Sequence, residues 1–239
     1  RDMTTLPDYF EVQHDAPKNL KIGIIRETMT DDVDTDVRAA VNNYADALRA
    51  AGHTVEMVAM PSIKHALAIY YIVVPAEISS NLARYDGVRY GRRAEGVKTL
   101  AELYGRSRGE GFVTENKRRI MIGSYVLSSG FFDAYYLQAQ KARTVLINEF
   151  NALFEQYDFL LMPTAPTPAF GLGENTSDPV KMYLADVMTV PPSLAGLPAI
   201  SIPAGSSSSG LPIGAQLVGP MKSDAKLIAL AGDMEGENE

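Results

Sequence analysis

The sequence LKIGII at residues 20–25 decides the fold class, because it is short, apolar and rich in β-branched residues, which indicates a buried strand. A helical pattern follows, with Asp34 or Thr35 as its N-cap and apolar residues at helical spacing up to a stop at Gly52. Residues 55–60 form a second apolar run. Strand, helix and strand within about forty residues predict a βαβ unit with a right-handed parallel crossover.

The rest of the chain continues this alternation. Residues 62–84 have a helical pattern in which Pro75 should produce a kink or begin a new helix. Residues 98–156 contain no strand signal and read as a helical layer, and a third buried strand follows at residues 159–162. A run rich in proline at residues 163–168 ends that strand.

The last third of the chain predicts a helix, a hairpin and a final helix. Asp178 and Pro179 are typical of a helix start, and that helix should run to about Met188. Apolar runs at residues 199–202 and 213–218, joined by a Gly/Ser loop, indicate a β-hairpin, and a helix should begin near Asp224. The sequence therefore predicts an α/β fold with a mixed β-sheet flanked by helices, in one domain over residues 20–239 after a linker at residues 1–19.

Composition restricts the possible functions. The net charge of −7 argues against a broad nucleic-acid-binding face, so any RNA contact should be local or should belong to a partner. No apolar run approaches the length of about eighteen residues that a membrane helix needs. The absence of cysteine excludes disulfides and thiolate zinc sites and fits a cytosolic protein. The start at Arg1, within a linker that lacks a signal-peptide pattern, suggests a fragment of a longer protein.

Few residues suggest chemistry by themselves. The three histidines, His14, His53 and His65, have no ligand spacing, so no metal site is predicted. No serine lies in a nucleophile elbow or beside an obvious base. The serine-rich loop at residues 205–210 leads into a strand instead of a lysine and a helix, so a hairpin tip is favoured over a phosphate cradle.

Arg119 is the most informative charged residue, because it adjoins the apolar sequence IMIG at residues 120–123 and should be partly buried, whereas Lys117 and Arg118 should lie on a solvated face. A buried arginine needs an anion, which is either a structural partner or a substrate carboxylate, and structural pairs are commoner. Asp186 lies in an otherwise apolar stretch and either forms a cap or faces a cleft. Tyr70 reads as core packing with its hydroxyl at the edge.

Several segments together resemble the amidase signature family, and within it the branch formed by the A subunits of the tRNA-dependent aspartyl/glutamyl amidotransferases. The run SNLARYDGVRYG at residues 80–91 is similar to that branch specifically. The other matching segments are Tyr70-Tyr71 and residues 76–79, 107–112, 117–136, 162–167 and 194–198.

The resemblance implies an enzyme that hydrolyses glutamine and supplies ammonia to partner subunits named B and C, a cytoplasmic hetero-oligomer without a membrane segment. The partner would use ATP and Mg to amidate Glu-tRNA(Gln) or Asp-tRNA(Asn), so the whole is a ligase of protein biosynthesis, and the mischarged tRNA would reach this chain only through the partner. The resemblance implies no cofactor and no metal for this chain.

The family's catalytic Lys, cis-Ser and nucleophilic Ser belong to its N-terminal half, so the resemblance implies no catalytic residue in this chain, and the isolated fragment should be inactive. It implies a substrate clamp instead. Arg119 would bind the α-carboxylate of glutamine, Asp186 the α-ammonium, and Tyr70 would place its hydroxyl near the substrate.

Two other readings stay open. The protein is either a general amidase for small amides, without a tRNA partner, or, as an isolated chain, an inert scaffold or interaction module. Half of a sheet should also expose apolar surface, which predicts self-association or a covering partner chain.

Overall fold

The computed structural model describes residues 17–174, 182 and 184–236. Most of the predicted linker and the expected helix start at Asp178 lie outside the described residues. The chain forms two compact units, one made of the residues up to 67 together with those from 145 onward, and one made of residues 68–144. We call them the sheet unit and the helical unit. The expectation of a single domain stays a prediction.

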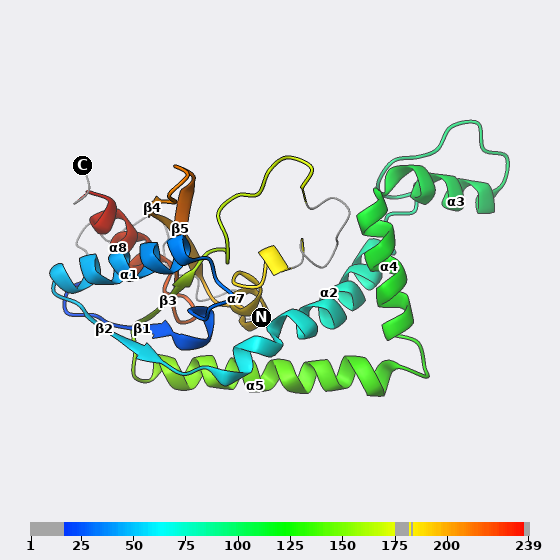
Figure 1. The fold of residues 1–239 in the computed structure, drawn as a ribbon. Coiled ribbons are helices and arrows are strands. Elements are labelled where there is room, and N and C mark those ends of the chain that lie inside the picture. Colours follow the sequence, from blue (N-terminus) through cyan, green and yellow to red (C-terminus); the bar gives the residue numbers. More distant parts are fainter. Residues whose placement is uncertain (1–16, 175–181, 183, 237–239) are drawn as a thin grey trace. The chain divides into compact units, whose positions relative to one another are not determined.

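The sheet unit contains the mixed β-sheet that the sequence predicts (Figure 1). β1 (Lys21–Ile25) lies between β2 (Thr54–Val58) and β3 (Phe159–Pro163) and is parallel to both. β5 (Pro212–Val218) runs antiparallel to β3 and to β4 (Ala199–Ser206), so the strand order is β2-β1-β3-β5-β4. The parallel β1 and β2 pair and the hairpin at the other edge are both confirmed.

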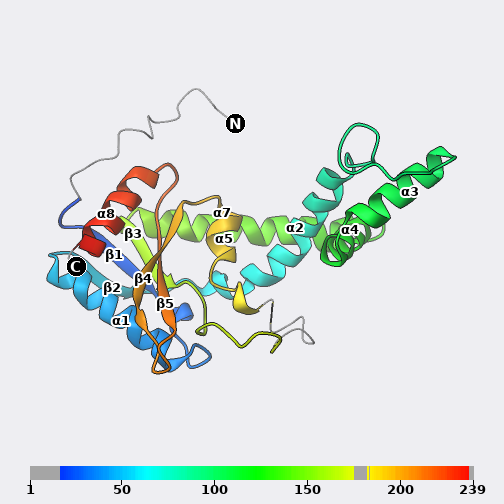
Figure 2. The same cartoon turned by 90° about the horizontal axis from the view of Figure 1, so that it is seen from above.

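Helices flank this sheet. α1 (Thr35–Ala50) and α8 (Asp224–Gly236) share one hydrophobic core with the strands, in which Leu48 of α1 and Leu230 of α8 are fully buried. Figure 2 shows both helices against the strands. α5 (Gln138–Phe154) buries Leu146 and Phe150 completely in its C-terminal half. Burial of these apolar side chains is the main stabilising term of the unit.

Local caps fix the ends of α1 as predicted. The Asp34 carboxylate accepts the Asp36 N–H at 2.8 Å, and Gly52 follows the helix with a φ of 92°. The serine-rich loop is the tip of the β4–β5 hairpin, as predicted, and Ser208 donates both its N–H and its hydroxyl to Asp36, each at 2.7 Å. These hydrogen bonds lower the pKa of Asp36 below its usual value.

The helical unit consists of helices and loops between them, and the predicted absence of strands over residues 98–156 is confirmed. Its elements are α2 (Ala66–Leu82, with its first two residues in the sheet unit), α3 (Leu100–Gly111), α4 (Thr114–Val126), a π-helical turn (Phe132–Leu137) and the start of α5. A short 3₁₀ helix, Pro61–His65, precedes α2.

Pro75 lies inside α2 and does not begin a new helix, so that alternative of the sequence prediction is wrong. Proline removes one backbone donor from a helix. The helix continues because its neighbours pack, with Val73 only 3% and Ala76 only 1% exposed. Tertiary packing here outweighs a local breaker.

Candidate functional site

The structure brings together two of the three predicted site residues, Tyr70 on α2 and Arg119 on α4. Arg119 Nη1 donates a hydrogen bond to the Tyr70 hydroxyl at 3.1 Å, and its guanidinium carbon lies 5.9 Å from the centroid of the Tyr70 ring. The contact therefore combines a hydrogen bond with a cation–π interaction. Tyr70 is half-buried and does not belong to the buried core, and its hydroxyl accepts the Arg119 hydrogen bond.

Glu115 is a third member of this group, which the sequence analysis missed. Its Oε1 accepts a hydrogen bond from Arg119 Nε at 3.0 Å, and its Oε2 accepts one from Arg118. The available signal was the spacing of four residues between Glu115 and Arg119, which places the two side chains on the same face of a helix. One carboxylate thus serves two cations, and only Arg119 also contacts Tyr70.

Arg119 is partly buried, as predicted, with 21% of its side chain exposed, against 48% for Arg118. Burial opposes its charge, but the hydrogen bonds to Glu115 and Tyr70 outweigh burial and raise the pKa of Arg119 above its usual value. Of its five N–H donors, these contacts use two, and the other three have no hydrogen-bond partner among the described residues. The guanidinium is therefore a fixed cation that can still bind an anion.

Lys117 and Arg118 are exposed, which confirms the prediction that they lie on a solvated face. Lys117 donates to the backbone carbonyl of Gly109, and Arg118 pairs only with Glu115 within the described part of the chain. Neither contact orients the cation toward a cleft.

Asp186 is exposed and belongs to the sheet unit, in a turn that leads into α7 (Val190–Ala195). Its backbone carbonyl accepts the N–H groups of Thr189 and Val190 at 3.1 and 3.2 Å. Its carboxylate makes no hydrogen bond with the residues that the structure describes. Because Arg119 and Asp186 lie in different units, their pairing across one substrate stays a prediction.

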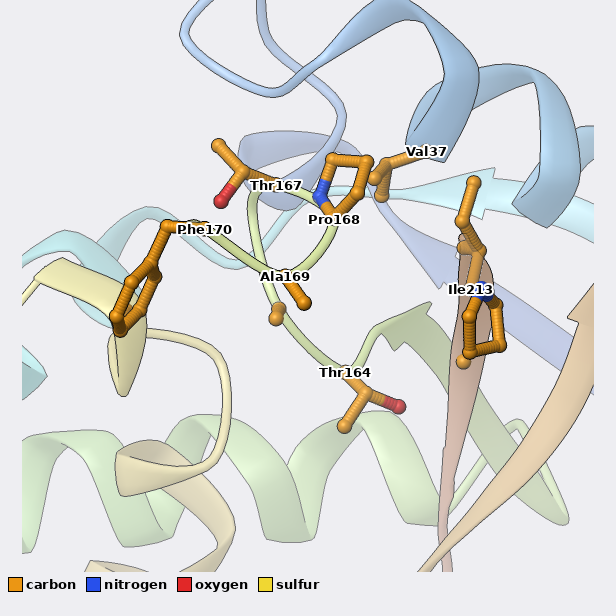
Figure 3. Close-up of a pocket in the computed structure, with 11 residues that line it drawn as sticks. Val37, Thr164, Thr167, Pro168, Ala169, Phe170 and Ile213 are labelled. Atoms are coloured by element: carbon orange, nitrogen blue, oxygen red, sulfur yellow. The ribbon is translucent and has the colours of Figure 1, made fainter. Parts of the chain in front are cut away.

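A cavity of about 220 Å³ lies beside this turn in the sheet unit (Figure 3). Its walls come from α1, from residues 164–170 after β3, and from the start of β5, and Ala185, next to Asp186, also lines it. The Thr164 and Ser201 hydroxyls lie 2.7 Å apart near this end of the sheet. From the sequence, residues 163–168 were interpreted as the end of a strand and as part of a segment that resembles the family, and neither interpretation predicted this cavity.

None of the helices described is long and apolar enough to cross a membrane. Within the same residues, no three or more histidine, aspartate or glutamate side chains form a group that could hold a metal ion.

Comparisons with known proteins agree with the motifs. The chain is 51% identical over 233 residues to the A subunit of glutamyl-tRNA(Gln) amidotransferase from Granulibacter bethesdensis, covering 98% of this chain and 47% of that protein. It is 48% identical over 235 residues to the protein of the same name from Thermosynechococcus vestitus, covering 97% and 49%. The chain thus spans about half the length of the curated relatives it matches.

Solved structures show the same fold. The A subunit of glutamyl-tRNA(Gln) amidotransferase from Thermotoga maritima superposes with a TM-score of 0.67 at 36% identity, covering 90% of this chain and 41% of that one. A 6-aminohexanoate cyclic dimer hydrolase superposes with a TM-score of 0.72 at 22% identity, covering 98% and 48%, which shows the fold alone. The family model described as Amidase matches residues 2–228. The chain therefore belongs to the amidase family, as its motifs predict.

Proposed function

We propose that this chain is the C-terminal half of the glutaminase subunit of a tRNA-dependent amidotransferase, and that it carries the glutamine clamp. The names of the relatives support this proposal, as does the coverage of about half their length. The observation that carries it is the state of Arg119. It is partly buried, fixed by Tyr70 and Glu115, and retains donors for a further anion.

An amino-acid substrate is a zwitterion, so its pocket needs one group of each charge. Arg119 supplies the cation for the α-carboxylate, with the Tyr70 hydroxyl beside it, and Asp186 supplies the anion for the α-ammonium. A substrate held at both ends points its side-chain amide in one direction, which lowers the entropic part of the reaction barrier.

The chemistry itself is performed by residues outside this chain. In this proposal a Lys-Ser-Ser set in the N-terminal half forms an acyl-enzyme with glutamine and releases ammonia. The ammonia passes to the B and C subunits, where ATP and Mg support amidation of Glu-tRNA(Gln) or Asp-tRNA(Asn). The glutaminase needs no cofactor, and its contact with tRNA runs through the partner.

The test is Arg119→Lys in the full-length protein, assembled with its partner subunits. A lysine cannot offer the planar fork of an arginine, so kcat/KM for glutamine should fall about 10- to 100-fold. Ammonia release at varied glutamine concentration measures the effect. The matched control is Arg118→Lys, the exposed neighbour, which should leave both constants unchanged. Unchanged glutaminase kinetics in Arg119→Lys contradict the proposal.

A further inference from the structure

We propose that the loop between α2 and α3, residues 83–99, is a binding surface for single-stranded RNA. We call this segment the Arg–Tyr loop, after its sequence RYDGVRYGRR at residues 84–93. The inference goes beyond the proposed function, in which tRNA is held by a partner subunit, and it does not depend on that function.

Positive charge is concentrated in the helical unit. Residues 68–144 contain 12 Lys and Arg against 7 Asp and Glu, a net charge of +5, so with −7 for the whole chain the remainder carries −12. The Arg–Tyr loop alone holds five basic residues and two acidic ones. The negative charge of the whole chain therefore conceals a local basic patch of the kind that binds phosphates.

The basic side chains of the loop are available. Arg84, Arg89 and Arg93 are exposed, and their guanidinium groups make no ion pair or hydrogen bond with the described residues, although Arg89 interacts electrostatically with Asp86. Arg92 is 66% exposed and lies 3.6 Å from Glu110, which also pairs with Arg106. Most of the positive charge is thus not compensated within the unit.

Two tyrosines alternate with these arginines. Tyr85 and Tyr90 are 42% and 57% exposed, and their ring centroids lie 6.3 Å apart. Unpaired RNA bases stack on exposed aromatic rings while arginines contact the phosphates, which is how proteins bind single strands. Every nucleotide of RNA carries both a phosphate and a base, whereas an acidic polypeptide offers stacking groups only where it also has aromatic side chains, so the observations favour RNA.

The loop is also held in one conformation although its side chains are exposed. The Asp86 carboxylate accepts the N–H groups of Val88 and Arg89 at 2.8 and 3.2 Å, which lowers the pKa of Asp86. Arg108 of α3 donates to the carbonyls of Leu82 and Tyr85 at 2.9 and 3.0 Å.

A buried serine of α3 completes this support. Ser107, only 3% exposed, accepts the N–H of Ala94 at 3.0 Å. It packs so closely on Gly87, which has a φ of 78°, that an added Cβ would lie 2.6 Å from the Ser107 Cβ. A surface whose backbone is fixed in advance loses less entropy when it binds a ligand.

The test measures binding of the full 239-residue chain to a fluorescein-labelled oligouridylate of about 20 nucleotides, by fluorescence anisotropy between about 50 and 200 mM salt. The triple variant Arg84→Gln, Arg89→Gln, Arg93→Gln should bind at least tenfold more weakly. For this variant, the slope of the logarithm of the association constant against the logarithm of the salt concentration should be shallower by about 2, because three phosphate contacts are lost. Tyr90→Ala, which keeps every charge, should bind about tenfold more weakly with an unchanged slope.

The matched control removes three exposed lysines of the sheet unit, in Lys21→Gln, Lys64→Gln, Lys226→Gln, and should bind RNA like the wild type. Circular dichroism confirms that each variant is folded. No RNA binding by the wild-type chain at the lowest salt, or equal weakening in both triple variants, overturns the proposal. So does labelled polyglutamate that binds as tightly as RNA and is lost in the loop variant, since the partner is then an acidic protein.

Discussion

At the scale of single residues, helix geometry separates three neighbouring cations. Lys117, Arg118 and Arg119 are consecutive, and each step along a helix turns the side chain by about 100°. Only Arg119 therefore reaches Tyr70, while Lys117 bonds to the Gly109 carbonyl and Arg118 pairs with Glu115. The apolar residues after Arg119 were sufficient to predict its partial burial. They could not identify Tyr70 as its partner, because that contact joins residues 49 positions apart.

We expect Glu115 to act as a positioning residue for Arg119. In the full-length protein, Glu115→Ala should raise KM for glutamine about tenfold with little change in kcat, because Arg119 Nε loses the acceptor that orients the fork. Glu115→Gln keeps an oxygen acceptor and should give an intermediate KM. Steady-state ammonia release separates the two constants.

The control for this prediction is Arg118→Gln, which removes the other partner of Glu115 and should leave KM unchanged. A purely structural role for Glu115 would lower the melting temperature without moving KM. If Arg119→Lys raises KM and Glu115→Ala does not, the positioning role is wrong and the proposed function stands.

At the scale of elements, the contact between α2 and α4 depends on one glycine. A Cβ added at Gly123 would lie 2.6 Å from the Pro75 carbonyl carbon and 2.7 Å from the Ser79 Cβ, so the helices meet there backbone to backbone. Ser79 and Ser124 hydroxyls, 3.0 Å apart, join the helices at the same level. Arg119 precedes Gly123 by about one turn of α4, so this contact determines the position of Arg119 along the helix axis relative to Tyr70 on α2.

Gly123→Ala should therefore destabilise the protein, although alanine is the better helix former. We expect the free energy of unfolding to fall by about 1–3 kcal/mol, because the added methyl group forces α4 away from the Pro75 carbonyl. Urea unfolding of the 239-residue chain measures it. The same substitution at Gly105, in α3, meets open space and should stabilise the protein by about 0.5–1 kcal/mol. Equal effects at the two sites would contradict the packing argument.

At the scale of the whole molecule, the two units carry different features. The sheet unit has the buried core, with Asp186 and a cavity beside it, while the helical unit carries Arg119 and the basic Arg–Tyr loop. The nucleophile that the family uses belongs, in the proposed function, to the other half of the protein.

We accordingly expect the purified 239-residue chain to release no ammonia from glutamine. In the proposed function the chain would orient glutamine but would supply no activated hydroxyl, and orientation alone does not break an amide bond. A coupled ammonia assay of the chain, run beside the full-length protein, tests this. Ammonia release by the chain alone would refute the assignment of catalysis to residues outside it.

The sequence by itself predicted the strands, most of the helices, the mixed sheet and the family, but the helix expected to run to about Met188 is replaced by a turn at residues 186–189, and α7 was not predicted. Periods of two and 3.6 residues, caps such as Asp34, and turn residues such as Gly52 are local, so they can be read without knowing what packs on what. Pro75 shows the limit of such reasoning, because a local breaker was outweighed by the burial of its neighbours.

Only the tertiary structure decided which side chains meet. The Arg119 contact with Tyr70, the Ser208 contact with Asp36, and the Ser107 support beneath Gly87 join residues between 20 and 172 positions apart. Such contacts depend on how helices and strands pack, and no local period encodes that packing. The sequence could predict the partial burial of Arg119, and its helical spacing offered Glu115 as a partner, but only the packing of α2 on α4 brought Tyr70 to it.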